Sequence, residues 1–292
     1  MMKRTTNIIA AFLTTFVATT STAGEITHRS FASETLGRDY AYNVFLPDGY
    51  EDGNLRYPVL YLLHGSFGNE NDWAVQGRMQ LATDRLIDEG RIPPAIVVMP
   101  GGQSWWVDGY NEAAGTAFFK DLIPHIDARY RTIAGRDGRV IGGLSAGGYG
   151  TVNFVLEYPG MFAAGAALSP ASYVPLPPRS SSAHQHPAYL NADGNFDPAK
   201  WESLNYTEHL DGYKAQDIVV PLYINSGDHD EFDIAYHSAV LYQTLREHQP
   251  DAVEFRVVDG DHEWKVWIDT LPEAMEYVFS YTSRPQGIAP EN

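Results

Sequence analysis

Strand-length apolar runs alternate with helix-like segments along most of this chain, and this alternation constrains the fold more than any other feature. The runs 57–63 and 95–99 are continuously apolar, which is typical of strands buried on both faces of a sheet. Further strands are predicted at 139–143, 162–168, 219–224 and 253–258, with helices at 76–89, 114–130, 146–158 and 234–248. Because strands and helices alternate, the sequence predicts an α/β fold with a mostly parallel central sheet and helices on both faces.

Two segments depart from this alternation. Residues 26–45 show partial period-two alternation that stops at Pro47-Asp48-Gly49, which predicts a hairpin. Residues 171–213 carry several prolines and a serine run, and we expect a long loop there, at the carboxyl edge of the sheet where ligands bind in such folds. A length of 292 residues admits two domains or one large one. The continuous alternation favours a single domain over residues 24–292.

The first 23 residues resemble a secretory signal peptide. A short basic start precedes a mostly apolar run at 8–20, and Ser21-Thr22-Ala23 offers small residues before a cut ahead of Gly24. The apolar run is shorter than the roughly 20 residues that span a bilayer, which argues against a membrane anchor. We therefore expect a periplasmic or secreted protein without a stable membrane anchor after cleavage.

The composition argues against several classes of function. Asp and Glu total 37 against 20 Lys and Arg, a net charge of −17, so nucleic acid and anionic membranes are not expected partners. The chain has no cysteine, which excludes disulfides, thiolate metal sites and cysteine nucleophiles. It carries no phosphate-loop or dinucleotide fingerprint either, so no cofactor is expected.

A candidate nucleophile stands between the predicted strand 139–143 and the helix 146–158. Gly143-Leu144-Ser145-Ala146-Gly147 matches Gly-x-Ser-x-Gly, whose glycines permit a sharp strand-to-helix turn that exposes the serine hydroxyl. A serine needs a base to take its proton and an acid to orient that base. In this type of fold the chain order is Ser, then Asp or Glu, then His.

Both partners follow in that order. His262 comes just after the last predicted strand, 253–258, and is the expected base. The acid follows the strand 219–224, where the candidates are Asp228, Asp230 and Glu231. All of these residues lie at the carboxyl ends of strands, the edge where Ser145 is also expected.

The oxyanion of an ester reaction needs two backbone N–H donors. Ala146 follows the nucleophile and supplies the first, and Ser66, after the strand 57–63, is the best second donor. We expect His64 to hold this loop rather than to take part in the chemistry. Trp105, Trp106 and Tyr110 follow the strand 95–99 at the same edge, where they could stack on a sugar or an aromatic acyl group or form a hydrophobic floor under the long loop.

No metal site is expected. His262-Glu263 begins like the His-Glu-x-x-His zinc motif, but position 266 is Val. The acidic residues and the histidine between 228 and 233 do not have the spacing of a calcium loop. An orienting acid flanked by solvated carboxylates explains this segment better.

Several motifs together resemble a family of α/β hydrolases that are esterases. They are YLLHG at 61–65, NDW at 71–73, IPPAIVVMP at 92–100, LIPHID at 122–127, YRT at 130–132 and GGLSAGGYG at 142–150. The family includes feruloyl and acetylxylan esterases of carbohydrate esterase family 1, S-formylglutathione hydrolases, enterochelin esterases and mycolyltransferases. The resemblance runs from about residue 38 to 281 and implies an α/β-hydrolase fold.

The resemblance also bears on the site. The acid of the family commonly ends a Gly-x-x-Asp pattern, here Gly227 to Asp230, which selects Asp230. The closing Gly-x-His-x-Trp of the family corresponds to 260–264 and supports His262. Mycolyltransferases carry Asp-Gly where this chain has His64-Gly65, which argues against acyl transfer to trehalose.

These observations predict an exported serine carboxylic-ester hydrolase that works through an acyl-enzyme intermediate. The expected substrate is an acylated carbohydrate, with feruloyl or acetyl groups, or a related small ester. A general short-chain or siderophore esterase and an acyltransferase of the same fold are the alternatives. A carbohydrate-binding module without catalysis would tolerate loss of the Ser, Asp, His order, and the presence of that order counts against it.

Overall fold

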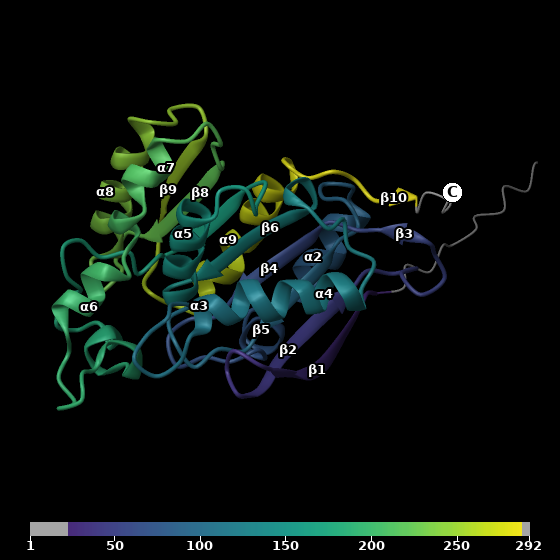
Figure 1. Cartoon of the computed structure of the whole chain (residues 1–292). Coiled ribbons are helices and arrows are strands. Elements are labelled where there is room, and N and C mark those ends of the chain that lie inside the picture. Colours follow the sequence, from purple (N-terminus) through teal and green to yellow (C-terminus); the bar gives the residue numbers. More distant parts are fainter. Residues whose placement is uncertain (1–22, 288–292) are drawn as a thin grey trace, which may run out of the picture.

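One eight-stranded sheet organises residues 23–287, which are the residues described by the computed structural model (Figure 1). The first two strands form the predicted hairpin, and β2 also pairs antiparallel with β5, whereas all further neighbours in the sheet are parallel. In spatial order the strands are β1 (Glu25–Ser33), β2 (Arg38–Leu46), β5 (Ile96–Pro100), β4 (Val59–Leu63), β6 (Arg139–Leu144), β7 (Gly165–Leu168), β8 (Leu222–Gly227) and β9 (Val253–Val258). A short strand, β10 (Gln286–Gly287), pairs with β3 (Leu55–Arg56).

Helices cover both faces of the sheet, as predicted. Figure 1 views the face that carries α3 (Ala114–Ala117), α4 (Ile123–Arg129), α5 (Ala146–Glu157) and α8 (Ile234–Arg246). A π-helical turn, Phe118–Leu122, joins α3 to α4. The other face carries α1 (Asp72–Val75), α2 (Met79–Asp88) and α9 (Trp264–Phe279).

The expectations from sequence do not include α9. Its buried residues recur at helical spacing, among them Val266, Leu271, Met275 and Val278, so a periodic signal exists. Pro272 stands inside the helix, and an internal proline removes a backbone donor and disfavours a helix. Packing of the apolar face of α9 on the sheet outweighs that local cost.

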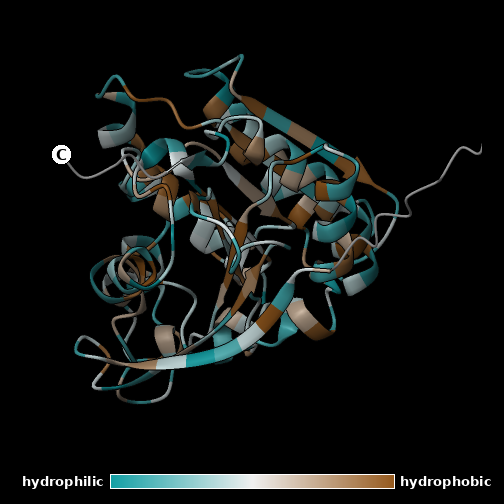
Figure 2. Cartoon of the chain, turned by 90° about the vertical axis from the view of Figure 1, so that its right-hand side faces the viewer, coloured by the Kyte–Doolittle hydropathy of each residue, from teal (hydrophilic) through white to brown (hydrophobic). Residues whose placement is uncertain are grey.

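The two faces of the sheet bury alternate residues of the same strand. In β4, the side chains of Val59, Tyr61 and Leu63 belong to the core under α3 to α5, whereas Leu60 and Leu62 belong to the core under α2 and α9. This double burial explains why the central strands are continuously apolar. Figure 2 shows the apolar strands in the middle of the molecule.

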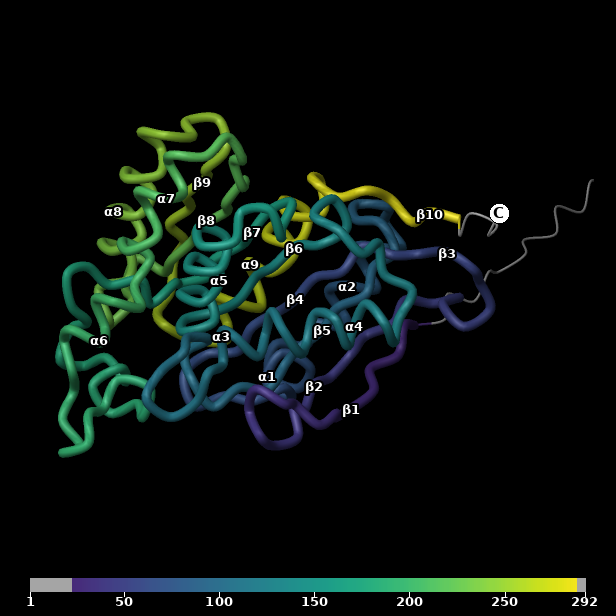
Figure 3. Tube along the Cα trace, in the orientation of Figure 1, coloured from purple at the N-terminus to yellow at the C-terminus, as the bar shows by residue number. Residues whose placement is uncertain are grey.

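The segment 171–213 is not the long loop that its prolines and serines suggest. It contains α6 (Pro198–Ser203), α7 (Leu210–Lys214) and three 3₁₀ turns, Ser182–Gln185, Pro187–Tyr189 and Tyr206–Glu208. Pro198 is the first residue of α6, and the Asp197 side chain accepts hydrogen bonds from the first-turn N–H groups, so these polar residues begin a helix rather than prevent one. In Figure 3 the segment lies at the left end of the molecule, around the α6 label.

Buried aromatic side chains hold this segment in place. Trp201 and Tyr189 are fully buried, and the ring of Trp201 stacks on Tyr149 of α5 with 5.3 Å between the centroids. The ring of Trp105 meets that of Trp201 edge to face at 5.8 Å. The segment therefore forms a third core with α5 and the loop after β5.

The predicted signal peptide, residues 1–23, lies outside the described residues except for Ala23. Among the helices of residues 23–287, none has the length and apolar character needed to cross a bilayer.

Candidate active site

Ser145 lies at the sharp turn between β6 and α5. Its backbone has φ 53° and ψ −116°, a conformation that residues with a side chain rarely adopt. A Cβ on Gly143 would lie 2.6 Å from the Gly147 carbonyl, and one on Gly147 would lie 2.5 Å from the Leu63 carbonyl oxygen. The turn therefore requires glycine on both sides of the serine, and it presents the hydroxyl to a cavity at the sheet edge.

His262 and Asp230 reach this hydroxyl from two other loops. His262 lies between β9 and α9, and Asp230 lies between β8 and α8. The Nε2 atom of His262 is 2.9 Å from the Ser145 Oγ atom, and its Nδ1 atom is 2.8 Å from the Asp230 Oδ2 atom. The Asp230 side chain is fully buried and that of His262 is 11% exposed, so solvent hardly weakens these hydrogen bonds.

The hydrogen bonds around Asp230 determine which nitrogen of His262 carries the proton. An ionised carboxylate only accepts, so the Nδ1–H group donates to Asp230 and the Nε2 lone pair faces the serine. The other carboxylate oxygen, Oδ1, accepts from the backbone N–H of Phe232 at 3.1 Å. The imidazole ring also meets the rings of Phe232 and Trp267 edge to face, at 4.9 and 5.0 Å between centroids. This arrangement can take the serine proton and return it to a leaving group.

The other two candidates for the acid have different surroundings. Asp228 is exposed, pairs with His229 at 2.8 Å and accepts from the backbone N–H of Gly260 at 3.1 Å. The Gly260 hydrogen bond lowers the pKa of Asp228 below its ordinary value. The side chain of Glu231 is exposed as well. Among the three, only Asp230 contacts His262.

The backbone N–H groups of Ser66 and Ala146 lie near Ser145, and neither has an acceptor in the described part of the chain. Ala146 is the first residue of α5, where N–H groups have no partner within the helix. Ser66 follows β4 in the neighbouring loop, and its Oγ atom accepts a hydrogen bond from the Trp105 Nε1 atom at 2.9 Å. Such groups can bind a developing negative charge.

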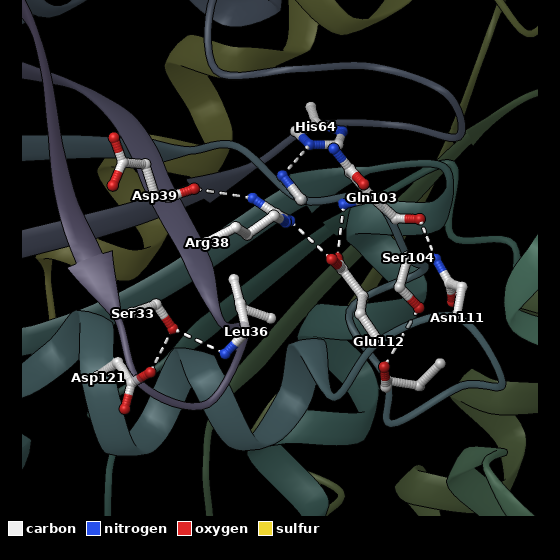
Figure 4. Close-up of polar contacts among 12 residues, drawn as sticks. Ser33, Leu36, Arg38, Asp39, His64, Gln103, Ser104, Asn111, Glu112 and Asp121 are labelled. Atoms are coloured by element: carbon white, nitrogen blue, oxygen red, sulfur yellow. Dashed lines mark hydrogen bonds and ion pairs between the residues drawn. The ribbon is translucent and has the colours of Figure 1, made fainter.

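His64 holds the loop after β4, as expected. Its Nδ1–H donates to the Gly65 carbonyl at 2.7 Å. Its Nε2 atom accepts from the Gly102 N–H at 3.0 Å, and this second bond is the dashed line at His64 in Figure 4. Burial lowers the pKa of His64, so the ring is neutral at pH 7. A neutral imidazole that both donates and accepts ties the loop after β4 to the loop after β5.

The cavity in front of Ser145 has a volume of about 400 Å³, and several aromatic side chains line it. Trp105 lines it, together with five aromatic residues that were not predicted to contact substrate: Phe67, Tyr173, Phe232, Trp264 and Trp267. Trp264 stands two residues after His262, so its position in the sequence could have predicted that it lines the active-site cavity. Tyr173 comes from the 171–213 segment, whose path could not be read from its composition.

The structure does not bring Trp106 or Tyr110 to this cavity. Trp106 is fully buried, and its Nε1–H donates to the His64 carbonyl at 3.1 Å. Tyr110 is 53% exposed, and its hydroxyl donates to Asp197 at 2.7 Å. The interpretation of these two as substrate-stacking residues is therefore wrong for Trp106, which packs under the loop, and finds no support in the cavity for Tyr110.

One group of side chains among the described residues has the spacing of metal ligands. It consists of Asp228, His229 and Asp259, whose ligand atoms all lie within 4.8 Å of one another. All three side chains are exposed, and Asp228 already binds His229 and the Gly260 N–H. Asp230, by contrast, is directed at His262 and lies outside this group.

Comparisons with known proteins identify similar chains. A family model described as "Putative esterase" matches residues 33–278. The endo-1,4-beta-xylanase/feruloyl esterase of Xylanibacter ruminicola is 39% identical over 162 residues, which are 52% of this chain and 22% of that protein. The matched segment thus spans about a fifth of that relative.

Two further matches cover most of both proteins. The acetyl esterase of Caldicellulosiruptor saccharolyticus is 25% identical over 265 residues, 85% of this chain and 96% of that one. A solved structure of a ferulic acid esterase superposes with a TM-score of 0.78 at 27% identity, covering 89% of this chain and 98% of that chain.

Proposed function

Because the chain belongs to this esterase family and has its α/β-hydrolase fold, we propose that it is a serine ester hydrolase. Ser145 is the nucleophile, His262 the general base and acid, and Asp230 the group that orients His262. The observation that carries the proposal is the continuous chain of hydrogen bonds from Asp230 through His262 to Ser145, in the wall of an aromatic cavity.

The reaction follows from these positions. The Ser145 Oγ atom attacks the ester carbonyl while its proton passes to the Nε2 atom of His262. The N–H groups of Ser66 and Ala146 stabilise the oxyanion that forms. His262 then gives the proton to the leaving alcohol as the carbon–oxygen bond breaks, which leaves an acyl-enzyme. A water molecule that loses a proton to His262 attacks the acyl group. His262 returns this proton to the Ser145 Oγ atom as the bond between that atom and the acyl carbon breaks, and the acid is released.

The substrate that we propose is an acylated carbohydrate, with feruloyl or acetyl as the acyl group. The names of similar proteins, a xylanase/feruloyl esterase and a ferulic acid esterase, support the aromatic acyl group. The aromatic walls of the cavity, from Trp105, Phe232 and Trp264, suit such a group as well. The similarity to an acetyl esterase keeps a general short-chain esterase as the second candidate.

Hydrolysis of a panel of esters tests this function. The mature protein and its Ser145→Ala variant are compared on p-nitrophenyl esters of rising chain length, methyl ferulate and acetylated xylan. We expect turnover that depends on Ser145 and is highest with an ester of ferulate or of an acetylated carbohydrate. Turnover that survives in Ser145→Ala would overturn the proposed mechanism. A clear preference for simple acetyl or butyryl esters would show that the protein is a general short-chain esterase.

We also propose that the chain is exported and cleaved before Gly24, leaving one domain over residues 24–292. The backbone nitrogen of Gly24 donates to Asp84 of α2 at 3.0 Å, and the Gly24 carbonyl accepts from Gln80 at 2.6 Å. Cleavage at this point would turn the Gly24 nitrogen into an α-ammonium group beside the Asp84 carboxylate, and the hydrogen bond would become an ion pair. N-terminal sequencing of the protein from the periplasm or medium of an expressing bacterium tests this, with Gly24 expected first. An uncleaved chain that stays with the cells would contradict it.

A further inference from the structure

A second cavity, of about 370 Å³, adjoins the cavity in front of Ser145. Phe67 and Gly68 line both cavities, so the two share a wall. Phe67 directly follows Ser66, whose N–H group is part of the proposed oxyanion site. A molecule that fills the second cavity therefore lies next to the reacting ester.

The shared wall carries an exposed aromatic ring in an unfavourable backbone conformation. The ring of Phe67 is 64% exposed, and its φ angle is 56°. A bulky residue with positive φ is strained, and a ring that is mostly exposed adds little burial that would offset this cost. The ring contacts that of His186, at 4.9 Å between the centroids. Its position is better explained by a ligand that covers the ring than by stability.

Two amide side chains, those of Gln103 and Asn111, also line this cavity. The Asn111 Nδ2 atom donates to the Gln103 carbonyl at 2.6 Å, as Figure 4 shows, whereas the Gln103 side chain and the Asn111 Oδ1 atom have no hydrogen bond among residues 23–287. These atoms are available to a ligand with hydroxyl groups.

The loop that carries these amides is held in place by charged and buried groups. The backbone N–H of Gln103 donates to Glu112 at 2.8 Å, and Glu112 pairs with Arg38 of β2 at 2.6 Å (Figure 4). The preceding residue, Gly102, donates to the buried His64. A cavity that is already ordered before binding loses little conformational entropy when a ligand enters.

The lining of the second cavity carries no net charge. It contains no carboxylate, lysine or arginine, and its two histidines are His64 and His186. Burial lowers the pKa of His64, and it lowers the pKa of His186 to about 4, so both rings are neutral at pH 7. An exposed aromatic ring and neutral amides in the lining of one cavity suit a ligand that has one apolar face and a rim of hydroxyl groups.

We propose that this second cavity is a subsite for a neutral sugar ring of the carbohydrate that bears the ester, with the ring stacked on Phe67 and its hydroxyls bound by Gln103 and Asn111. The proposal rests on the proposed function in one respect, because the sugar is part of the substrate. The subsite itself binds sugar without an ester, so it is testable apart from catalysis.

The first experiment measures binding without chemistry. Neutral arabinoxylo-oligosaccharides that carry no ester are titrated into the wild-type protein, Phe67→Leu and the double variant Gln103→Ala/Asn111→Ala, by NMR or calorimetry. Leucine keeps the apolar bulk and removes the flat ring. Tyr236→Leu is the matched control, since Tyr236 is 65% exposed on α8 and lines neither cavity.

We expect saturable binding to the wild-type protein and to Tyr236→Leu, and a dissociation constant at least fivefold higher in the other two variants. Thermal melts establish that each variant is folded. If Phe67→Leu misfolds, the dissociation constant of the double variant still tests the subsite. No saturable binding to the wild-type protein, or equal binding by all variants, would overturn the subsite.

The second experiment separates the subsite from the esterase function. The kcat/KM of a feruloylated arabinoxylo-oligosaccharide is divided by the kcat/KM of methyl ferulate for each protein. We expect this ratio to fall about tenfold in Phe67→Leu and in the double variant, mainly through KM, and to stay constant in Tyr236→Leu. A constant ratio with turnover that still needs Ser145 would overturn the subsite alone. Turnover that survives Ser145→Ala would overturn the esterase mechanism and leave the binding result to decide the subsite.

Discussion

Replacing Asp230 by asparagine tests the proposed role of the acid because the neighbouring backbone determines how the new amide turns. The Oδ1 atom of Asp230 accepts from the N–H of Phe232 at 3.1 Å, and the Oδ2 atom accepts from the Nδ1–H of His262 at 2.8 Å. An asparagine must keep its oxygen toward the Phe232 N–H, since the opposite orientation would set two donors against each other. Its NH₂ group then faces the Nδ1 atom of His262 and donates to it. The imidazole proton moves to Nε2, where it faces the Ser145 hydroxyl and blocks proton transfer.

The expected loss is large because the wrong tautomer removes the base rather than weakening it. An asparagine in place of the acid of such a triad lowers kcat by about 10⁴-fold, which corresponds to roughly 5.4 kcal/mol of transition-state stabilisation. The side chain is isosteric, so the melting temperature should change little. The assay is kcat for p-nitrophenyl acetate, with circular dichroism to verify folding.

Asp228→Asn is the matched control, because it makes the same chemical change two residues away in the same loop. Asp228 is exposed and accepts from the Gly260 N–H, which an amide oxygen can continue to do. We expect kcat to stay within about threefold of the wild-type value, as is usual for surface substitutions. A loss below tenfold in Asp230→Asn, or equal losses in the two variants, would refute the reasoning.

Four further predictions follow from individual contacts. Trp105→Phe removes the hydrogen bond to the Ser66 hydroxyl, and kcat should fall about fivefold, the equivalent of ~1 kcal/mol for one hydrogen bond; an unchanged kcat would show that this bond does not hold the oxyanion loop. Gly143→Ala places a Cβ against backbone atoms 2.6 Å away, and the melting temperature should drop by several degrees, whereas a stable variant would contradict the tight turn. Unfolding free energy should decrease as pH falls from 6.5 to about 4, because His186 takes up a proton over that range only when unfolded; His186→Asn should flatten this part of a urea-midpoint curve, and an unchanged curve would refute the role. Asp84→Asn should lower the melting temperature of the protein that begins at Gly24 by about 2 °C, and less when residues precede Gly24, since only the free α-ammonium pairs with the carboxylate.

The sequence predicts the central sheet well because two-face burial leaves a continuous apolar signal. The strands at 57–63, 95–99 and 139–143 all appear within a few residues of their expected bounds. The order of Ser145, Asp230 and His262 also follows from chain topology, since each stands just past a strand. What brings them together is the shared carboxyl edge of parallel strands, a property of the fold class rather than of local sequence.

The walls of the site are harder to predict, because they depend on how separate segments pack. The composition of 171–213 indicates a loop, yet aromatic burial of Trp201 against Tyr149 turns it into ordered short helices. Trp105 and Trp106 are adjacent and look equivalent in sequence, but only Trp105 faces the cavity in front of Ser145. The difference arises from backbone: Trp106 has a φ angle of 61°, which turns its side chain into the core. Helix and strand propensities do not predict such a change in the direction of a side chain.

Unfavourable backbone conformations gather where the chemistry is proposed. Six non-glycine residues in the described part of the chain have positive φ, and five of them follow five strands of the parallel sheet in turn: Phe67 after β4, Trp106 after β5, Ser145 after β6, Ser169 after β7 and Asp233 after β8. Residues held in this region persist only where surrounding structure determines them. Here the surrounding structure is the doubly covered sheet, whose buried strands fix both ends of each loop.

The two parts of the fold have different roles. The packed sheet and helices stabilise the protein, and this stability offsets the strain of loops at the carboxyl edge, which hold side chains in positions that an unstrained backbone would not reach. Ser145 is aimed at His262 in this way, and Phe67 is held out between two cavities in the same way. Positive φ thus occurs both at the proposed nucleophile and at the ring of the proposed sugar subsite, in loops at the same edge of the sheet.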